Sequence, residues 1–486
     1  MYLKQFFVEG LGHASYLIGS DQTQEAAVVD PGRDIETYVA EAQQRGFKIR
    51  YALETHLHND FVSGARQLAQ HVGAEYVASA EARLEFPYRA VGEGDELRLG
   101  ELRISVLFTP GHTPEHVTYV VGDTARAEAP VLVFTGGDLL VGTVGRPDLL
   151  GPELGRKLAP LLYDSLHQKI LTLEDYVEVL PTHGAGSLCG RGISGKRTST
   201  IGYERRFNPA LQKKTKKEFV EYVLSGNPGI PTYYRRMRPT NQQGPSDWRR
   251  PEPRPLTPDE VAHLVGHGAI VLDTRSNVAF GGGHIPGAIN IGLDTMFATW
   301  VGWLVPSDVP LVLVIDDPQA WGEVVTRLAR VGYERVVGYL QFGMSSWIEA
   351  AHPIGQIPQW TVSKLHDELA QARPQVLDVR TDSEWESGHI PEAVHIMLGD
   401  LPERVGELDQ SRPIAVICGS GYRSSIASSV LRQRGLTKLA NVLGGMTAWK
   451  AAGYPDTDGP EVLDGHSMAE QLRVRDEGQF ILPRSD

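Results

Sequence analysis

The sequence predicts a multidomain α/β protein, and three observations carry that prediction. Residues 1–235 alternate short apolar runs with glycine-rich turns and amphipathic stretches, a pattern typical of a mixed α/β domain. Residues 256–354 and 360–460 share one succession of motifs, which indicates a tandem duplication. A chain of 486 residues is also too long for one hydrophobic core. We therefore expect one larger domain followed by two small, related ones.

The N-terminal domain is predicted from its alternating periodicities. Apolar runs at 26–30, 104–108 and 131–134 have the length and β-branched content of buried strands, and each ends in a turn rich in Gly, Pro or Asp. Residues 35–44 and 62–71 have the spacing of helices. The two kinds of element together predict a mixed α/β fold.

Six residues of the metal-ligand type follow these apolar runs at the starts of loops. Because the ends of neighbouring strands meet at one edge of a sheet, we expect the six side chains to share one cavity. Imidazole and carboxylate groups together suit a transition metal. The six residues are His56, His58, Asp60, His112, Asp138 and His183.

Two segments lack any periodicity. Residues 236–255 are rich in Pro, Arg and Gln, and we predict a linker there. Residues 461–486 are polar, and we predict a loosely packed C-terminal tail. Neither segment carries a motif that indicates chemistry.

The duplication is visible in paired motifs. Val-Leu-Asp-Thr-Arg at 271–275 matches Val-Leu-Asp-Val-Arg at 376–380, and Gly-His-Ile-Pro occurs at 283–286 and again at 388–391. Each copy alternates predicted strands and helices, which favours a small sheet covered by helices on both faces.

The second copy contains a candidate nucleophile. An apolar strand predicted at 413–417 ends at Cys418, and a helix is predicted at 425–435. Loop N–H groups, the helix dipole and the charge of Arg423 stabilise a thiolate at such a turn. The loop that we expect to form the site consists of Cys418, Gly419, Ser420, Gly421, Tyr422, Arg423 and Ser424.

The first copy differs from the second at this loop. Asp316 lies as far before Trp347 as Cys418 lies before Trp449. A carboxylate repels an anionic sulfur, and Pro318 removes one loop N–H group. We therefore expect the first copy to be inactive and to act as a scaffold or docking element, or to bind a cation at Asp316.

Residues 360–458 resemble a rhodanese domain through the motifs at 376–380 and 388–391, the Cys418 loop and the Gly-Gly-Met-Thr-Ala-Trp segment at 444–449. The resemblance implies that Cys418 carries sulfur as a persulfide and passes the outer sulfur to a thiophilic acceptor. Residues 256–354 resemble the same fold without the catalytic cysteine.

Residues 1–235 resemble the metallo-β-lactamase fold, which implies an αββα sandwich. The common family pattern is H-x-H-x-D-H, and this sequence has Phe61 in place of the last histidine. An aromatic carbon ring cannot bind a metal, so we expect a site for one metal ion. Two imidazoles and one carboxylate form the facial set that suits Fe(II) and O2 chemistry.

Within this fold the chain resembles the persulfide dioxygenases, also through its segments 183–190 and 200–209. The resemblance implies one Fe(II) per chain, bound by His56, His112 and Asp138. The residues expected around the metal and the substrate are His58, Asp60, His183, Cys189 and Arg205.

The implied reaction converts a low-molecular-weight persulfide and O2 into a thiol and sulfite. Glutathione and coenzyme A are the expected thiol carriers, and sulfite and thiosulfate the expected partners of Cys418. The basic run from Arg191 to Arg206 could bind such an anionic carrier or be a solvated face. Cys189 could relay sulfur or be a small buried residue. The resemblance also favours a homo-oligomer.

Composition excludes several other classes of function. The chain has 47 basic and 60 acidic residues and a net charge of −13, which argues against binding nucleic acid or anionic membranes. No apolar run approaches the roughly 18 residues needed to span a bilayer, and no secretory segment precedes the first strand. Two cysteines cannot build a disulfide framework. We expect a cytoplasmic protein.

Two alternatives remain at this point. A zinc-dependent thioester hydrolase resembling glyoxalase II shares the fold and most ligands, but it usually needs two metals, which Phe61 disfavours. A non-catalytic protein that senses persulfide or docks partners would have degenerate modules throughout, as the Asp316 loop is. The intact Cys418 loop and the full set of metal-ligand residues favour an enzyme.

Overall fold

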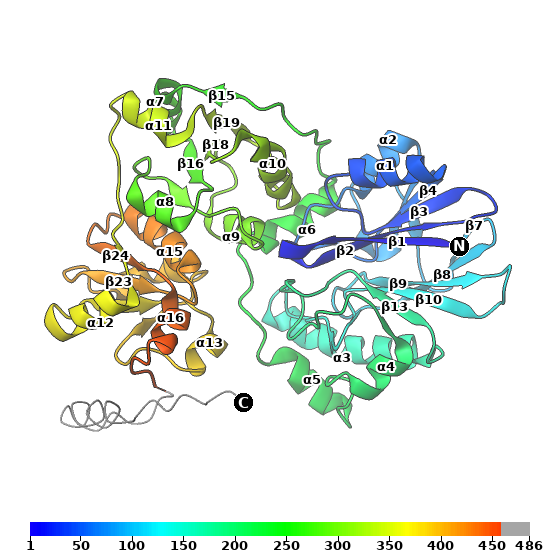
Figure 1. Cartoon of the computed structure of the whole chain (residues 1–486). Helices are drawn as coiled ribbons and strands as arrows, with labels where there is room; N and C mark the ends of the chain where they lie inside the picture. The colour runs from blue at the N-terminus through cyan, green and yellow to red at the C-terminus, as the bar shows by residue number, and fades with distance from the viewer. Residues whose placement is uncertain (458–486) are drawn as a thin grey trace, which may run out of the picture. The chain divides into compact units, whose positions relative to one another are not determined.

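The computed structural model describes residues 1–457 (Figure 1). The tail predicted at 461–486 lies outside the described residues. The chain folds into two compact units. The first comprises Met1–Thr274 and Leu293–Ser346, and the second comprises Arg275–Gly292 and the chain from Trp347 onward.

The N-terminal part of the first unit contains two six-stranded sheets. Strands of the first sheet follow chain order, namely β1 (Tyr2–Val8), β2 (His13–Gly19), β3 (Glu25–Val29), β4 (Lys48–Leu53), β5 (Glu75–Ser79) and β6 (Arg89–Val91). The second sheet has the order β14 (Ser199–Thr200), β13 (Glu178–Pro181), β10 (Pro130–Gly136), β9 (Val117–Asp123), β8 (Leu102–Phe108) and β7 (Glu96–Leu99). A small hairpin pairs β11 (Leu139–Leu140) with β12 (Thr143–Val144).

Alternation along the strands divides this domain into layers. In β2, Tyr16 and Ile18 point into the core between the two sheets, whereas Leu17 points to the helices outside. Ala27 and Val28 of β3 divide in the same way. This two-sided burial explains why the strands are almost continuously apolar.

Helices cover both outer faces. Beside the first sheet lie α1 (Glu36–Arg45) and α2 (Ala65–Val72), and beside the second lie α3 (Pro152–Gln168), α4 (Ile201–Phe207) and α5 (Lys216–Leu224) (Figure 1). The predicted αββα sandwich is thereby confirmed. Within residues 1–457, no helix combines the length and the apolar character needed to cross a membrane.

The segment predicted to be a linker contains regular structure. Helix α6 (Tyr234–Gln243) begins just before it, and Met237, Asn241 and Trp248 are buried. The segment 236–255, predicted to be a linker, therefore begins within a helix that extends to Gln243. The sequence does not predict this helix, because it is polar and contains Pro239. Contacts to distant loops hold the helix instead.

Most of the first rhodanese-like copy also belongs to the first unit. The sheet of this copy has the order β15 (Pro255–Leu256), β19 (Val336–Leu340), β18 (Leu311–Val314), β16 (Ile270–Asp273) and β17 (Ile289–Asn290), of which the first four belong to this unit. Its helices in this unit are α7 (Pro258–Gly266), α9 (Phe297–Leu304), α10 (Trp321–Arg330) and the start of α11 (Gly343–Glu349).

This copy packs directly on the N-terminal sandwich. Arg330 forms a bidentate ion pair with Asp34, with N···O distances of 2.8 and 2.7 Å. The Arg33 guanidinium bonds Glu334, and the Val62 N–H donates to the Arg330 carbonyl at 2.8 Å. The chain around the predicted metal-binding motif is therefore in contact with the first copy.

The second unit contains a five-stranded parallel sheet with the order β20 (Gln359–Trp360), β24 (Leu439–Val442), β23 (Ile414–Ile417), β21 (Gln375–Asp378) and β22 (Val394–His395). Its helices are α12 (Val362–Gln371), α13 (Asp382–Glu386), α14 (Leu401–Arg404), α15 (Tyr422–Gln433) and α16 (Gly445–Ala451). The unit also includes α8 (Asn277–Gly282) and β17 (Ile289–Asn290), which come from the first copy.

Candidate metal centre and cysteine loop

The structure brings four of the predicted histidines together. The ring centroid of His56 lies 4.3 Å from that of His58, 5.0 Å from that of His112 and 5.3 Å from that of His183. Each ring follows the end of a strand, as the sequence predicts, and all four are buried.

The donor atoms of these rings converge. Nε2 of His56 and Nε2 of His183 face each other at 3.3 Å. Among the described residues, ligand atoms lie within 4.8 Å of one another in the sets His56–His58–His183, His112–His183–Cys189 and Asp30–Glu54–His58. Nε2 of His112 is buried and has no hydrogen-bond partner. Nitrogen atoms in such an arrangement fit a shared cation.

Burial sets the protonation of two of these ligands. Desolvation, followed by the charges of neighbouring imidazoles, holds the pKa of His56 and the pKa of His112 well below the usual value. Both rings are therefore neutral at physiological pH. Neutral imidazole is the form that binds a metal.

Asp138, the predicted carboxylate ligand, lies beside His112 but outside those sets. Its Oδ1 accepts the backbone N–H of His112 at 3.0 Å, and its Oδ2 is 3.3 Å from Nδ1 of His116. Oδ2 makes no well-aligned hydrogen bond, and burial raises the pKa of this carboxyl well above its usual value. A buried oxygen without a partner fits a cation, so the residues present are compatible with a metal here.

His58 and Asp60 have carboxylate and imidazole partners of their own. Burial alone would lower the pKa of His58, but the charges of Glu54 and Asp30 raise it to about 10. Nε2 of His58 is 2.7 Å from Glu54 and 3.4 Å from Asp30. Burial alone would raise the pKa of Asp60, but its interactions with His183, 3.2 Å away at Nδ1, and with His58 and His13 lower it to about 2. This contact orients His183 in the way second carboxylates orient metal-bound histidines.

Phe61 fills the position where the common family pattern has a further histidine. Its side chain is 1% exposed and its ring stacks on His58 at 4.2 Å and on His13 at 3.8 Å. The ring is a carbon wall beside the histidine cluster and offers no donor atom to a second metal.

The remaining predicted residues differ in their surroundings. Cys189 is buried near His112 and His183, its Sγ lies 3.9 Å from the Tyr234 hydroxyl, and burial raises the pKa of its thiol well above the usual value. Arg205 instead pairs with Asp175 and with the carbonyls at 171 and 173. The structure therefore does not bring Arg205 into the histidine cluster.

Helix α6 holds the metal-binding loop, a role that sequence reasoning missed. Nδ2 of Asn241 donates to the carbonyls of His58 and Phe61 at 2.9 Å each, and its Oδ1 accepts the Ser63 N–H at 2.9 Å. The Tyr233 hydroxyl donates to the carbonyl of Asp60 at 3.1 Å. Four backbone groups of the loop are thus satisfied by one helix.

A buried carboxylate, also missed, joins two loops to that helix. Glu115 accepts the Leu57 N–H at 2.9 Å and forms a bidentate pair with Arg238 at 2.9 and 2.7 Å. His116 accepts the Gly137 N–H and lies next to Asp138. The only sequence signal for these residues was their position three and four residues after His112.

The Cys418 sulfur is buried at the end of a strand and lies close to a loop N–H and a hydroxyl. Cys418 follows β23, is 1% exposed, and its Sγ accepts the N–H of Gly421 at 3.1 Å. The Ser424 hydroxyl lies 3.4 Å from Sγ. Helix α15 begins at Tyr422, three residues earlier than predicted, so its first free N–H groups belong to the loop.

Arg423 is engaged by a carboxylate that the sequence analysis did not identify. Its guanidinium forms a bidentate pair with Glu384 of α13 at 2.7 and 2.6 Å. Burial would raise the pKa of Glu384, but the pair with Arg423 lowers it to about 2. The positive potential expected from Arg423 is therefore largely neutralised at neutral pH.

In the equivalent loop of the first copy, a side chain of the loop itself caps the turn. Asp316 and Asp317 are exposed, and the Asp317 carboxylate accepts the Gln319 N–H at 2.8 Å. A short turn at Pro318–Ala320 follows. A carboxylate caps this turn where the second copy leaves N–H groups free, so an anion is disfavoured.

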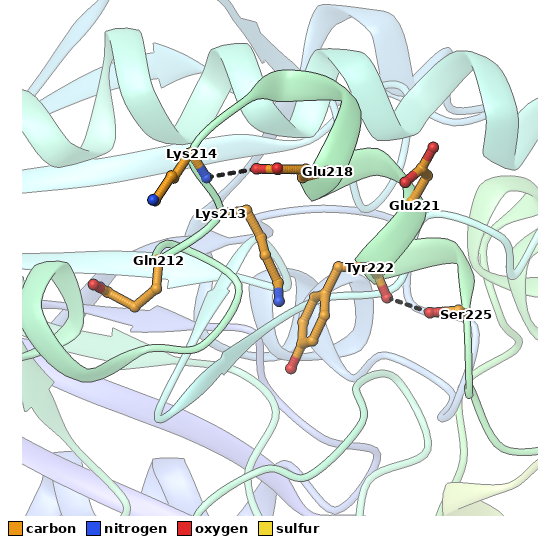
Figure 2. A pocket seen from close by; sticks show the side chains of 7 residues that line it. All are labelled: Gln212, Lys213, Lys214, Glu218, Glu221, Tyr222 and Ser225. Atoms are coloured by element: carbon orange, nitrogen blue, oxygen red, sulfur yellow. Dashed lines mark hydrogen bonds between the residues drawn. The ribbon is translucent and has the colours of Figure 1, made fainter.

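Lys213 and Lys214 line a shallow groove at α5 (Figure 2). Lys213 extends beside the Tyr222 ring with its Nζ 4.4 Å from the centroid, and Arg191 lies 4.5 Å from the same centroid. Glu218 and Glu221 line the groove as well. Its charge is mixed, and none of the predicted site residues lines it.

Family models match both halves of the chain. The metallo-beta-lactamase superfamily model matches residues 8–192, and the rhodanese-like domain model matches residues 257–350 and 361–452. Both predicted resemblances are confirmed. The fold and the site define a metallo-β-lactamase-fold protein that carries two rhodanese-like domains.

Individual relatives narrow the class. The chain is 34% identical over 229 residues to persulfide dioxygenase ETHE1, mitochondrial, of Mus musculus, covering 46% of this chain and 80% of that one. It is 28% identical over 217 residues to hydroxyacylglutathione hydrolase GloC of Haemophilus influenzae, covering 40% and 91%. A crystal structure of a metallo-beta-lactamase from Staphylococcus aureus is 33% identical, with a TM-score of 0.64 and coverage of 70% and 98%. The chain belongs to the persulfide dioxygenase family, here fused to two rhodanese-like domains.

Proposed function

We propose that the chain oxidises a low-molecular-weight persulfide with O2 at one Fe(II) site and transfers sulfane sulfur through Cys418. It is an enzyme of sulfur metabolism. The observation that carries the proposal is the convergence of the buried His56, His112 and His183, beside which the ring of Phe61 stands where the common family pattern has a further histidine. Family membership supports the same conclusion.

At the metal centre the proposed reaction is R–S–SH + O2 + H2O → R–SH + SO3²⁻ + 2H⁺. His56, His112 and Asp138 would hold the ion, because they combine neutral imidazoles with a buried carboxylate oxygen that lacks a partner. Fe(II), when bound, supplies the redox and Lewis-acid chemistry by which O2 reacts with the persulfide sulfur. Asp60 orients His183, and Phe61 keeps one wall of the cavity apolar.

At the cysteine loop the proposed reaction is a pair of sulfur transfers. In the first, Cys418–S⁻ attacks the outer sulfur of thiosulfate, the S–S bond breaks, and its electron pair leaves with sulfite. In the second, a thiol takes the outer sulfur from Cys418–S–S⁻ and restores the thiolate. The N–H groups at the start of α15, where the structure has no side-chain cap, stabilise the anionic outer sulfur.

The two reactions share an intermediate, because sulfite is the product of the first site and an acceptor of sulfur at the second. One polypeptide that carries both sites raises the effective concentration of that intermediate. We propose glutathione persulfide or coenzyme A persulfide as the substrate and a homo-oligomer as the assembly. We also propose a cytoplasmic location, since both cysteines are unpaired and a reducing compartment keeps them so.

The alternative is a zinc-dependent thioester hydrolase with a sulfurtransferase domain. The similarity to hydroxyacylglutathione hydrolase GloC favours it, since that relative covers the same part of the chain at 28% identity. Phe61 disfavours it, because a bridging hydroxide usually requires a second metal and this ring offers no ligand.

Oxygen uptake and metal content distinguish the two functions. Purified enzyme is given glutathione persulfide, coenzyme A persulfide or a glutathione thioester in an oxygen electrode, and bound metals are quantified. We expect about one iron per chain and one sulfite formed per O2 consumed. Two zinc ions per chain, thioester turnover and no O2 uptake would contradict the dioxygenase.

A further inference from the structure

Part of the inactive copy lies in the same compact unit as the Cys418 loop. Residues 275–292, which include α8 and β17, fold within the second unit, together with the Cys418 loop. By sequence, this segment belongs to the first copy. We call it the inserted segment.

The inserted segment is hydrogen-bonded to the Cys418 loop itself. Nδ2 of Asn277 donates to the carbonyl of Gly421 at 3.3 Å, and the Tyr422 hydroxyl donates to the carbonyl of Gly292 at 3.0 Å. Gly292 also lies against the Tyr422 ring, because an added Cβ there would be 3.4 Å from a ring carbon. Two adjacent loop residues are thus held from the inserted segment.

Asn290 holds the first turns of α15, the helix that follows the Cys418 loop. It is 2% exposed, and its Oδ1 accepts the Ser425 hydroxyl at 2.6 Å. Its backbone N–H donates to Ser429 Oγ at 3.1 Å, and its Nδ2 donates to the carbonyl of Arg275 at 3.0 Å. A buried amide with these bonds holds α15 at a set position against the inserted segment.

These contacts act on the part of the loop that meets the sulfur. The Gly421 N–H donates to Cys418 Sγ, and Gly421 has a φ of +106°. The Gly421 carbonyl accepts from Asn277 and, at 3.3 Å, from Asn441 of the second copy. Because a peptide group is planar, holding this carbonyl also sets the direction of the Tyr422 N–H at the start of α15.

We propose that the inserted segment is a positioning element of the Cys418 site, acting through Asn277, Asn290 and the Tyr422 hydroxyl. The proposal rests on the proposed sulfur-transfer function of Cys418. The inactive copy thus supplies one donor and two acceptors that hold the persulfide loop and the start of α15 in an anion-binding conformation. Pre-organised N–H groups stabilise an anion without reorganising when it forms. Asn277, Asn290 and Tyr422 are positioning residues, since they act through the loop.

Asn277→Asp is the sharpest variant, because aspartate has the shape of asparagine but cannot donate and carries a negative charge. Tyr422→Phe removes only the hydroxyl, and Asn277→Ala removes the amide. The matched control is Gln356→Ala, because Gln356 donates to the carbonyl of Gly282 in the same segment, at a bond that does not involve the loop. All variants are made in the full-length enzyme.

The measurements are thiosulfate-to-thiol transfer, the lifetime of the loaded Cys418 persulfide by cyanolysis, and O2-dependent persulfide oxidation. Activities are normalised to the folded fraction from circular dichroism. We expect kcat for transfer to fall about tenfold in Asn277→Asp and about threefold in Asn277→Ala and Tyr422→Phe, with KM within about twofold of wild type. Persulfide lifetime should fall in parallel. Gln356→Ala should match wild type, and O2 uptake should be unchanged in all four.

Different outcomes would refute the positioning role of the inserted segment and the proposed function of Cys418. Wild-type kcat and persulfide lifetime in both Asn277→Asp and Tyr422→Phe would overturn the positioning role. An equal loss in Gln356→Ala would overturn it too, because the effect would then reflect general loosening of the segment. Full transfer activity in Cys418→Ser would instead refute the proposed function of the cysteine loop.

Discussion

The two rhodanese-like copies have the same order of strands but different loops at the position of the nucleophile. In the second copy Cys418 is buried and accepts a loop N–H, and Gly421 opens the helix without a side-chain cap. In the first copy Asp316 is exposed, and the Asp317 carboxylate accepts a hydrogen bond from an N–H group of the following turn. The fold is common to both, and the chemistry depends on a few loop residues.

A domain that lacks the catalytic cysteine can therefore keep a structural role. The first copy packs on the metal-binding sandwich through the Arg330–Asp34 pair, and its inserted segment bonds the Cys418 loop. A domain without a nucleophile thereby contacts the surroundings of both candidate sites.

Gly421→Ala should have the largest effect on the second copy. A φ of +106° is strained for any residue with a Cβ, and the added carbon would lie 3.2 Å from Nδ2 of Asn277 and 3.3 Å from the carbonyl of Val442. We expect a loss of about 1–2 kcal/mol in unfolding free energy and at least a tenfold loss of sulfur transfer. Chemical denaturation and steady-state kinetics measure the two. Wild-type values for both would show that the loop tolerates a different conformation.

Glu384→Gln should have an intermediate effect on specificity. The bidentate pair with Arg423 neutralises the guanidinium beside Cys418. Without the carboxylate the full positive charge faces the donor, so we expect KM for dianionic thiosulfate to fall about threefold to tenfold. KM for a persulfide of lower charge should change less. The comparison of the two donors is the test, and equal changes would exclude a charge effect.

The same variant should alter acid stability by a smaller amount. The pKa of Glu384 is lowered from its usual 4.5 to about 2 by Arg423. A lowered pKa contributes stability above pH 4.5 that is lost as the pH falls toward 2. Because the carboxylate is 37% exposed, solvent screening keeps this contribution below about 1 kcal/mol. Urea unfolding of wild type and Glu384→Gln across this pH range measures it, and parallel curves would contradict it.

Asp316→Cys should have the smallest effect. The first-copy loop retains Pro318, which has no N–H, and the Asp317 cap, so a cysteine there lacks the donors that stabilise a persulfide. In a Cys418→Ser background we expect no sulfur transfer and no persulfide detectable by cyanolysis. Appearance of either would show that the nucleophile alone, and not the loop, distinguishes the copies.

Sequence patterns predict those parts of the candidate site that depend on neighbouring residues in the chain. His56, His112, Asp138 and His183 each follow a strand, and this placement alone indicated that they converge. The duplication and the loss of cysteine at Asp316 were likewise readable from motif spacing. These features depend on short stretches of the chain, so they can be recognised in the sequence itself.

Long-range partners could not be predicted in the same way. Asn241 bonds the His58 carbonyl across 183 positions of sequence, and Arg423 meets Glu384 across 39. Helix α6 has a polar sequence with an internal proline, which resembles a linker until its contacts are known. Such residues are defined by tertiary packing, which overrides local propensity.

The division of labour between the two sites is tested most directly by one paired measurement. O2 uptake with glutathione persulfide and thiosulfate-to-thiol transfer are compared in wild type, Cys418→Ser and His112→Ala. We expect Cys418→Ser to abolish transfer and retain O2 uptake, and His112→Ala to retain transfer and lose O2 uptake together with bound metal. Loss of both activities in each variant, or retention of transfer in Cys418→Ser, would contradict the account.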